Sequence, residues 1–240
     1  MRRSLRWVIG GVVLLLLVIT GGTYFYIHVV EGPAPKKLSL ESTPNATAPS
    51  TSASASSNGS AGSATSGDLS GTWQPTSDSQ VGYRVNEVLF GQKNTAVGRT
   101  NKVTGTMVID GTTVKAVDLK VDMATVTSDE SRRDNQFRGR VMDVSSFPTA
   151  TFKLTKPIAL ASVPADGSTV SATATGDLTL HGTTKPVTVD LKAKRTGNTV
   201  AINGTIPVTF ADWGIPNPSN GPITTEDHGQ LELLVVFSKG

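Results

Sequence analysis

The sequence predicts an all-β domain, an antiparallel barrel or sandwich of about eight short strands, over residues 68–240. Two observations carry this prediction: short runs in which apolar and polar residues alternate, and turn dipeptides that separate these runs. A third observation concerns the residues before the domain, where an apolar N-terminal run is followed by a segment poor in large apolar side chains. The roughly 170 residues of the domain suit a single hydrophobic core.

Residues 1–30 have the features of a transmembrane anchor. Arg2, Arg3 and Arg6 precede a run from Trp7 to Val30 that contains no residue ionised at neutral pH. As a helix this run would be roughly 36 Å long, which is enough to cross a bilayer. A cleaved signal peptide would have a shorter apolar region, and the cationic flank is expected to stay in the cytoplasm. We therefore expect a single-pass protein of the cell membrane with an extracytoplasmic C-terminal domain.

Residues 31–67 predict a disordered linker between the anchor and the domain. Ser, Thr, Ala, Pro, Asn and Gly dominate this segment, and Leu38 and Leu40 are its only large apolar residues. Such a segment cannot bury enough apolar surface to offset the conformational entropy lost on folding. As a random coil it would span roughly 30–35 Å, so the domain is expected near the membrane surface and free to reorient.

Composition excludes several classes of function. The chain contains no cysteine, which excludes disulfides, thiol chemistry and lipoprotein attachment through a thiol. The net charge of +3 arises outside the domain, because residues 1–67 carry five Lys or Arg against two Glu, whereas residues 68–240 carry 17 charges of each sign. A nucleic-acid-binding domain needs a basic face that neutralises phosphates, so no nucleic-acid partner is expected.

The alternation of apolar and polar residues is clearest in two segments, 117–123 and 187–193, where every second residue is apolar. The same pattern recurs at 150–154, 200–202 and 231–237. Turn signals separate the strands at Asp110-Gly111, Asp166-Gly167, His181-Gly182 and Gly197-Asn198. Short strands at this spacing are typical of an antiparallel barrel or sandwich.

One stretch departs from the strand pattern and predicts a short helix. Residues 127–130 read Thr-Ser-Asp-Glu, which matches an N-terminal capping box. Two oppositely charged pairs follow at a spacing of four residues, Asp129–Arg133 and Asp134–Arg138. The helix would place Phe137 and Val141 on one face, directed at the barrel.

Eight short motifs occur in order along the domain. They occupy residues 79–85, 97–99, 103–106, 132–134, 142–144, 147–152, 176–187 and 212–215, and the run from Gly176 to Val187 is the most distinctive. Through these motifs the domain resembles the YceI-like family from about Gly71 to Phe237. The resemblance implies a lipocalin-like barrel of the bacterial envelope, of a kind associated with binding polyisoprenoids.

Two positions depart from the pattern of that family. Glu87 stands where relatives often have a histidine late on the first strand, and Phe210-Ala211 stand where an arginine commonly precedes the Asp-aromatic-Gly turn. Polar contacts that these residues make to a ligand headgroup in relatives are therefore not carried over. Residues 89–95 are expected to form a longer first connection, which would reshape the mouth of the barrel.

No catalytic or metal-binding residues are predicted. His181 and His228 lie in expected turns, and no local motif supplies a nucleophile with a base. Glu226, Asp227 and His228 are adjacent, and adjacent residues of an extended segment point to opposite faces, so they are not expected to converge on a metal ion. The pair Arg133-Asp134 is expected to be structural, with contact to a ligand headgroup as the alternative.

The candidate ligand-binding residues are inward apolar side chains. An eight-stranded barrel is either filled by its side chains or wide enough for one small ligand, and the residues alone leave both open. The abundance of small residues favours a cavity mildly, and the resemblance favours it further. The side chains expected to line it are those of Tyr83, Val85, Met107, Leu119, Phe137, Val141, Phe147, Phe152, Leu180 and Trp213.

The preferred hypothesis is a non-enzymatic carrier or sensor that holds a polyisoprenoid or isoprenoid quinone inside the barrel, with no other cofactor. One alternative is a ligand-free structural or interaction barrel of the envelope, with contact regions at 89–95 and 217–222. Another is an enzyme that acts on a lipid, with Glu87 or Asp212 as general base. That reading requires a carboxylate that faces the cavity.

Overall fold

The computed structural model describes residue 22, residues 34–42 and residues 68–240. The predicted anchor, apart from residue 22, and residues 31–33 and 43–67 of the predicted linker lie outside the described residues. Within the part of the chain that is described, no helix has the length and apolar character needed to span a membrane.

The alternating segments all form strands. In chain order the strands are β1 (Gly71–Pro75), β2 (Gln80–Leu89), β3 (Gln92–Thr100), β4 (Val103–Asp110), β5 (Thr113–Asp122), β6 (Thr149–Leu154), β7 (Ile158–Ala159), β8 (Thr169–Leu180), β9 (Thr183–Thr196), β10 (Thr199–Thr209), β11 (Ile223–Thr225) and β12 (His228–Lys239). The helical turns are η2 (Leu40–Ser42), η4 (Met123–Thr125), α2 (Ser131–Gln136), η5 (Phe137–Val141) and η6 (Phe210–Trp213).

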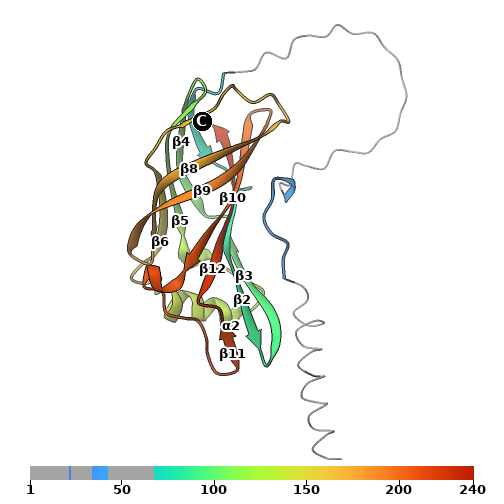
Figure 1. Ribbon diagram of the computed structural model, residues 1–240, viewed down its shortest axis with the longest axis vertical. Helices are drawn as coiled ribbons and strands as arrows, with labels where there is room; N and C mark the ends of the chain where they lie inside the picture. Colours follow the sequence, from blue (N-terminus) through green and yellow to red (C-terminus); the bar gives the residue numbers. More distant parts are fainter. Residues whose placement is uncertain (1–21, 23–33, 43–67) are drawn as a thin grey trace, which may run out of the picture.

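The described strands close into an antiparallel barrel, in the order β1-β4-β5-β6-β8-β9-β10-β12 and back to β1 (Figure 1). β1 pairs with β4, whereas β2, which follows β1 in the chain, pairs with β3 in a hairpin. The barrel of eight strands is thus confirmed. β3 lies off this ring, and β2 is its only partner among the described strands.

Closure depends on a break between β1 and β2, because β12 pairs with β1 through one half and with β2 through the other. Ser79 lies at this break and is fully buried. Its Oγ accepts a hydrogen bond from the Val236 amide at 3.1 Å and lies 3.3 Å from the Val236 carbonyl oxygen, to which it donates. The serine hydroxyl therefore replaces the backbone partner that β12 loses at the break.

The four expected turn dipeptides all connect strands. His181 and Gly182 both have positive φ, 48° and 72°, as a two-residue hairpin turn requires. The expectation of a long first connection over 89–95 was wrong. β2 and β3 stay paired as far as Leu89 and Gln92, and Phe90-Gly91 alone form the turn. The polar residues of this segment belong to a hairpin that extends past the barrel, where outward positions are not covered.

The short helix begins later than the capping-box pattern predicts. Its N-cap is Glu130, whose carboxylate accepts from the Arg132 amide at 3.0 Å, and the first helical residue is Ser131. Of the two predicted charge pairs, Asp129–Arg133 is formed. Asp134 does not pair with Arg138, because it is buried and accepts hydrogen bonds from the amide and hydroxyl of Ser128.

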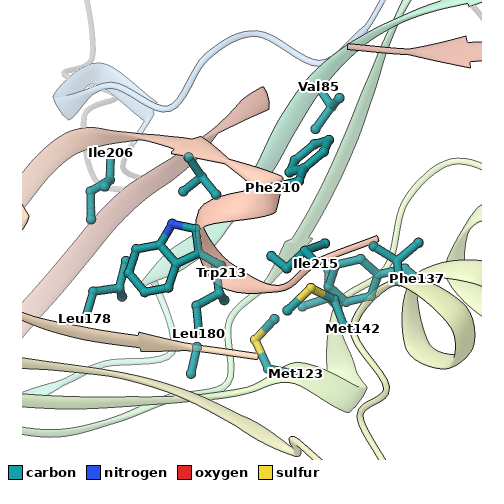
Figure 2. Packing of buried hydrophobic residues seen from close by; sticks show 14 of the residues in the cluster. Val85, Met123, Phe137, Met142, Leu178, Leu180, Ile206, Phe210, Trp213 and Ile215 are labelled. Carbon is teal, nitrogen blue, oxygen red and sulfur yellow. The ribbon is translucent and has the colours of Figure 1, made fainter. Parts of the chain in front are cut away.

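The helix continues into the π-helical turn η5, and Phe137 and Val141 are buried toward the barrel, as expected. They belong to the first of two apolar clusters, which lies at the α2 end and packs around η6 (Figure 2). The second cluster lies at the β1 end and includes Trp73, Met107 and Phe237. Two clusters, rather than one continuous core, leave the middle of the barrel less completely packed.

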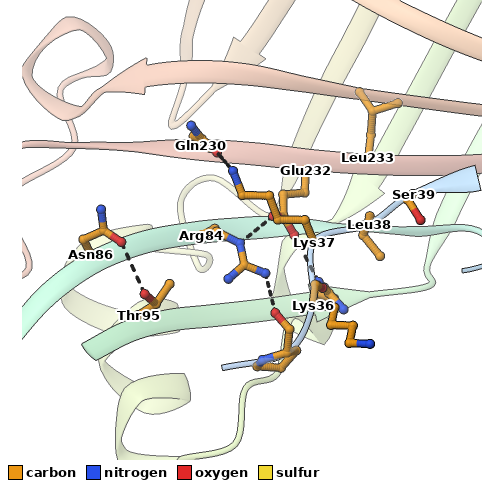
Figure 3. Close-up of polar contacts among 12 residues, drawn as sticks. Lys36, Lys37, Leu38, Ser39, Arg84, Asn86, Thr95, Gln230, Glu232 and Leu233 are labelled. Carbon is orange, nitrogen blue, oxygen red and sulfur yellow. Dashed lines mark hydrogen bonds and ion pairs between the residues drawn. The ribbon is translucent and has the colours of Figure 1, made fainter. Parts of the chain in front are cut away.

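Residues 34–42, which we call the strap, lie along the outside of the barrel (Figures 1 and 3). Leu38 is 7% exposed, and η2 contacts β9 and β10. Three barrel side chains hold the strap through its carbonyl oxygens: Arg84 donates to Pro35 at 2.6 Å, Arg99 to Lys36 at 2.5 Å and Asn203 to Leu38 at 2.9 Å. The expectation of disorder is therefore corrected for these nine residues.

Candidate functional site

A cavity of about 560 Å³ runs inside the barrel. It is lined by residues of both apolar clusters, Val85 and Phe137 from the first and Met107 and Phe237 from the second. It therefore extends along the barrel from one cluster to the other. The buried Trp73 of β1, whose indole donates to the Leu69 carbonyl at 2.9 Å, packs in the second cluster and does not line the cavity. The cavity is thus elongated and largely apolar.

Eight of the ten predicted site residues border this cavity: Tyr83, Val85, Met107, Leu119, Phe137, Val141, Phe152 and Leu180. Phe147 does not, because it lies outside the strand array and its ring packs against His181, with centroids 4.6 Å apart. Trp213 does not either. η6 folds it into the first cluster (Figure 2), and the Lys185 ammonium lies 6.0 Å from the ring centroid. That any of these side chains contacts a ligand stays a prediction.

Alternation along the later strands supplies lining residues that the predicted set omits. Val189, Leu191 and Leu233 occupy apolar positions of the patterns at 187–193 and 231–237 and border the cavity. The alternation pattern could therefore have identified these three residues. Phe90 and Gln136 also line the cavity, but no sequence pattern indicates them, because their positions depend on how the first hairpin and the helix pack on the barrel.

Polar groups gather at the α2 end of the cavity. Glu87 accepts from the Asn94 side chain at 2.9 Å, and its carboxylate lies 3.3 Å from the Arg133 guanidinium. Burial works against the charge on Arg133, but the nearby Glu87 and Asp129 carboxylates outweigh it and raise its pKa. The departure from the family pattern at Glu87 therefore places a paired carboxylate in the cavity lining. Arg133 has the expected structural role and also borders the cavity.

Tyr83 forms part of the wall beside this polar end. Its ring stacks on Phe137 with centroids 5.1 Å apart and an angle of 17° between the planes. Burial raises the pKa of the Tyr83 phenol, so the hydroxyl stays protonated at neutral pH. The other side of the ring covers Gly98, the residue paired with Tyr83 across the hairpin.

Gly98→Ala is expected to destabilise the barrel by about 1–3 kcal/mol. A Cβ at this position would lie 2.3 Å from the Tyr83 ring, so the ring would have to leave its place against Phe137. Thermal unfolding followed by circular dichroism measures the effect. Gly139→Ala is the matched control, because a Cβ there meets nothing within 4 Å. Equal midpoints for the two variants would show that the tyrosine is not held against the glycine.

The remaining candidate groups lie away from the cavity lining. The His228 ring contacts both neighbouring carboxylates, Asp227 at 2.8 Å and Glu226 at 3.5 Å. The hydrogen bond with Asp227 raises the pKa of His228. Among the described residues, no group of three acidic or histidine side chains is arranged to hold a metal ion. Asp212 is 59% exposed and lies 3.7 Å from the Lys185 ammonium. Of the two carboxylates considered as a general base, Glu87 borders the cavity and Asp212 does not.

A closed antiparallel barrel of eight strands around an elongated apolar cavity defines a lipocalin-like barrel. The sequence model of the YceI-like domain matches residues 73–237. The chain belongs to the YceI-like family, as the motifs suggested.

The curated relatives are bacterial proteins. The chain is 35% identical over 147 residues to a UPF0312 protein of Pseudomonas aeruginosa, an alignment that covers 58% of this chain and 70% of that protein. It is 32% identical over 128 residues to a UPF0312 protein of Vibrio parahaemolyticus, covering 50% of this chain and 64% of the relative's length.

Two solved structures share the fold. A polyisoprenoid binding domain from Saccharophagus degradans, implicated in plant cell wall breakdown, superposes with a TM-score of 0.57 at 12% identity, covering 70% of this chain and 98% of that one. BcnA of Burkholderia cenocepacia superposes with a TM-score of 0.53 at 20% identity, covering 68% of this chain and 98% of its own. At these identities the likeness concerns the fold.

Proposed function

We propose that this protein is a membrane-tethered extracytoplasmic lipid-binding protein that holds one isoprenoid or quinone-like molecule inside its barrel, without catalysing a reaction. The observation that carries the proposal is the elongated apolar cavity of about 560 Å³. Its volume falls in the range of about 300–1,000 Å³ that is typical of small-molecule sites. A long, narrow apolar space suits a prenyl chain better than a compact ligand.

The energetic argument favours an occupied cavity over a ligand-free barrel. Without a ligand, the apolar lining of the cavity is left in contact with water at its open end. A lipid that covers this lining gains about 25 cal/mol for each Å² of apolar surface buried, so burial of a few hundred Å² is enough to retain it.

The ends of the cavity support the same ligand class. Exposed Phe90 and Arg132 border the cavity at the α2 end, so a chain would enter there. There the ion pair of Glu87 and Arg133 and the Tyr83 hydroxyl offer polar partners for a headgroup. The polyisoprenoid-binding domain of Saccharophagus degradans has the same fold, which adds support for a prenyl ligand. The anchor predicted over 1–30 would hold the barrel beside the bilayer that supplies it.

The experiment is native mass spectrometry of the full chain, purified from bacterial membranes in a mild detergent, before and after solvent extraction. We expect a stoichiometric mass of a prenyl lipid or quinone that is absent after extraction. Incubation of the extracted protein with a polyprenol or an isoprenoid quinone should restore it. A mass without ligand both as purified and after incubation would overturn the proposal in favour of the ligand-free barrel.

A further inference from the structure

The hairpin β2–β3 carries two exposed apolar side chains at its tip. Among the described residues, Phe90 at 59% and Val88 at 38% are the large hydrophobic side chains that are exposed. Isolated exposed apolar residues are common on protein surfaces. Here the two residues are two positions apart, and both lie at the tip of the β2–β3 hairpin.

The conformation of Phe90 gives no folding reason for a phenylalanine. Its φ is 49° and that of Gly91 is 81°, the left-handed combination of a two-residue hairpin turn. Asn, Asp and Gly favour such turns, whereas a bulky residue with positive φ is strained. With Phe90 59% exposed, partial burial offsets only part of this strain. A contact outside the described chain would offset the rest.

The tip lies beside the opening of the cavity. Phe90 borders the cavity together with Pro222 of the segment before β11 and Arg132 of α2. β11 pairs with the end of β2, and Figure 1 shows the hairpin tip, β11 and α2 at the same end of the barrel. A molecule that enters the cavity at this end therefore passes Phe90.

The strap gives the direction of the membrane. Along the strap, Pro35 and Lys37 lie at the level of Arg84 and Gln230, and Leu38 lies at the level of Asn203 and Leu233. Arg84 is nearer the hairpin tip than Asn203 and Leu233 are. In chain order, the strap therefore runs from the tip side of the barrel toward the opposite end.

The short chain between the predicted anchor and the strap limits the distance between the membrane surface and the barrel. The residues from Val30 to Ala34 span at most about 14 Å. From Arg84 to the tip of the hairpin, β2 extends roughly 20 Å in the same direction. A strap held against the barrel therefore brings the tip to the bilayer surface and removes the free rotation that a disordered linker would allow.

We propose that the open end of the barrel docks on the surface of the lipid bilayer, with Phe90 and Val88 inserted at the boundary of headgroups and acyl chains. This inference rests on the membrane tethering in the proposed function. Exposed Lys93, paired with Val88 across the hairpin, and exposed Arg132 lie at this end and suit a layer of lipid phosphates. The cavity then opens toward the membrane, and a prenyl chain enters without crossing water.

The test is tryptophan quenching in the full chain reconstituted into liposomes of phosphatidylcholine and phosphatidylglycerol with brominated acyl chains. Phe90→Trp places the probe at the tip. Thr196→Trp is the matched control, at an exposed position beside the β9–β10 turn at the opposite end of the barrel. Emission of the wild-type chain, which contains Trp7, Trp73 and Trp213, is subtracted.

We expect the added emission of Phe90→Trp to fall by at least half in brominated liposomes, and that of Thr196→Trp to stay within about a tenth of its value in unbrominated ones. Absence of quenching at position 90, or equal quenching at both positions, would overturn the docking. A second variant, Val88→Ser with Phe90→Ser, should slow uptake of a polyprenol from vesicles about tenfold. The quenching does not require a bound ligand, so its failure and the failure of lipid binding in mass spectrometry are distinguishable.

Discussion

Leu119→Trp is expected to reduce the lipid that co-purifies with the protein at least tenfold, while the barrel stays folded. Leu119 alternates inward on β5, opposite Phe152 of β6, and both border the cavity. Although it faces inward, Leu119 is not fully buried, because the space in front of it is the cavity. An indole at this position would enter that space instead of displacing packed neighbours. Filling a cavity commonly stabilises a protein by about 0.5–2 kcal/mol, so the ligand-free variant should unfold no earlier than the ligand-free parent.

Lys120→Trp is the matched control for this prediction, since Lys120 is the next residue of β5 and is exposed outside the barrel. It should retain the full complement of lipid. Leu180→Trp is a poorer choice, because Leu180 is 3% exposed within the first cluster and overpacking typically costs about 1–3 kcal/mol. Native mass spectrometry and thermal unfolding measure the two effects separately. Full lipid retention in Leu119→Trp would place the ligand outside this part of the barrel.

The strands could be predicted because each inward face is apolar and each outward face is mostly polar. The patterns at 117–123 and 187–193 correspond to β5 and β9, with Met123 lying just beyond β5 in η4. Turn dipeptides fixed the hairpins, since positive φ restricts the residues that a tight turn accepts. The residues facing the interior were therefore largely predictable, and the two exceptions, Phe147 and Trp213, lie outside the strands.

The existence of the cavity could not be predicted from the residues alone. A filled barrel and a hollow one have the same alternation, and the free volume depends on strand tilt and on how side chains from opposite walls meet. The predicted pairing of Asp134 with Arg138 was wrong for a different reason. The amide and hydroxyl of Ser128 donate to the Asp134 carboxylate, and these local hydrogen bonds take the place of the expected ion pair.

The strap escaped prediction for a different reason. The barrel binds the strap largely through backbone carbonyl oxygens of the strap. Because every residue has such a carbonyl, the sequence of the strap does not indicate these contacts. A signal was present on the other side of the contact. From Leu231 to Phe237 nearly every residue is apolar on both faces of β12, which is typical of a strand covered on both sides. Glu232 is the exception in that run.

Glu232→Ala is expected to lower the free energy of unfolding by about 3–5 kcal/mol, which corresponds to a fall of roughly 10 °C in the melting temperature. The Glu232 side chain is 3% exposed and lies 2.5 Å from the Nε of Arg84 and 3.1 Å from a terminal nitrogen of Arg99. Removing it leaves two largely buried guanidinium groups side by side without a counter-charge. A buried pair that loses one partner costs far more than a surface pair.

The same substitution tests how the strap is held, because Arg84 and Arg99 also bind the carbonyl oxygens of Pro35 and Lys36 (Figure 3). Amide hydrogen exchange over residues 36–42 should become at least tenfold faster in Glu232→Ala. Glu226→Ala is the matched control, since this glutamate is 44% exposed and accepts from the Asn86 side chain at 3.1 Å. It should cost less than about 1 kcal/mol and leave exchange in the strap unchanged. If Glu232→Ala unfolded at the wild-type temperature with a protected strap, the buried charges would not be what fastens the strap to the barrel, and the orientation of the open end would have to rest on Leu38 and Asn203 alone.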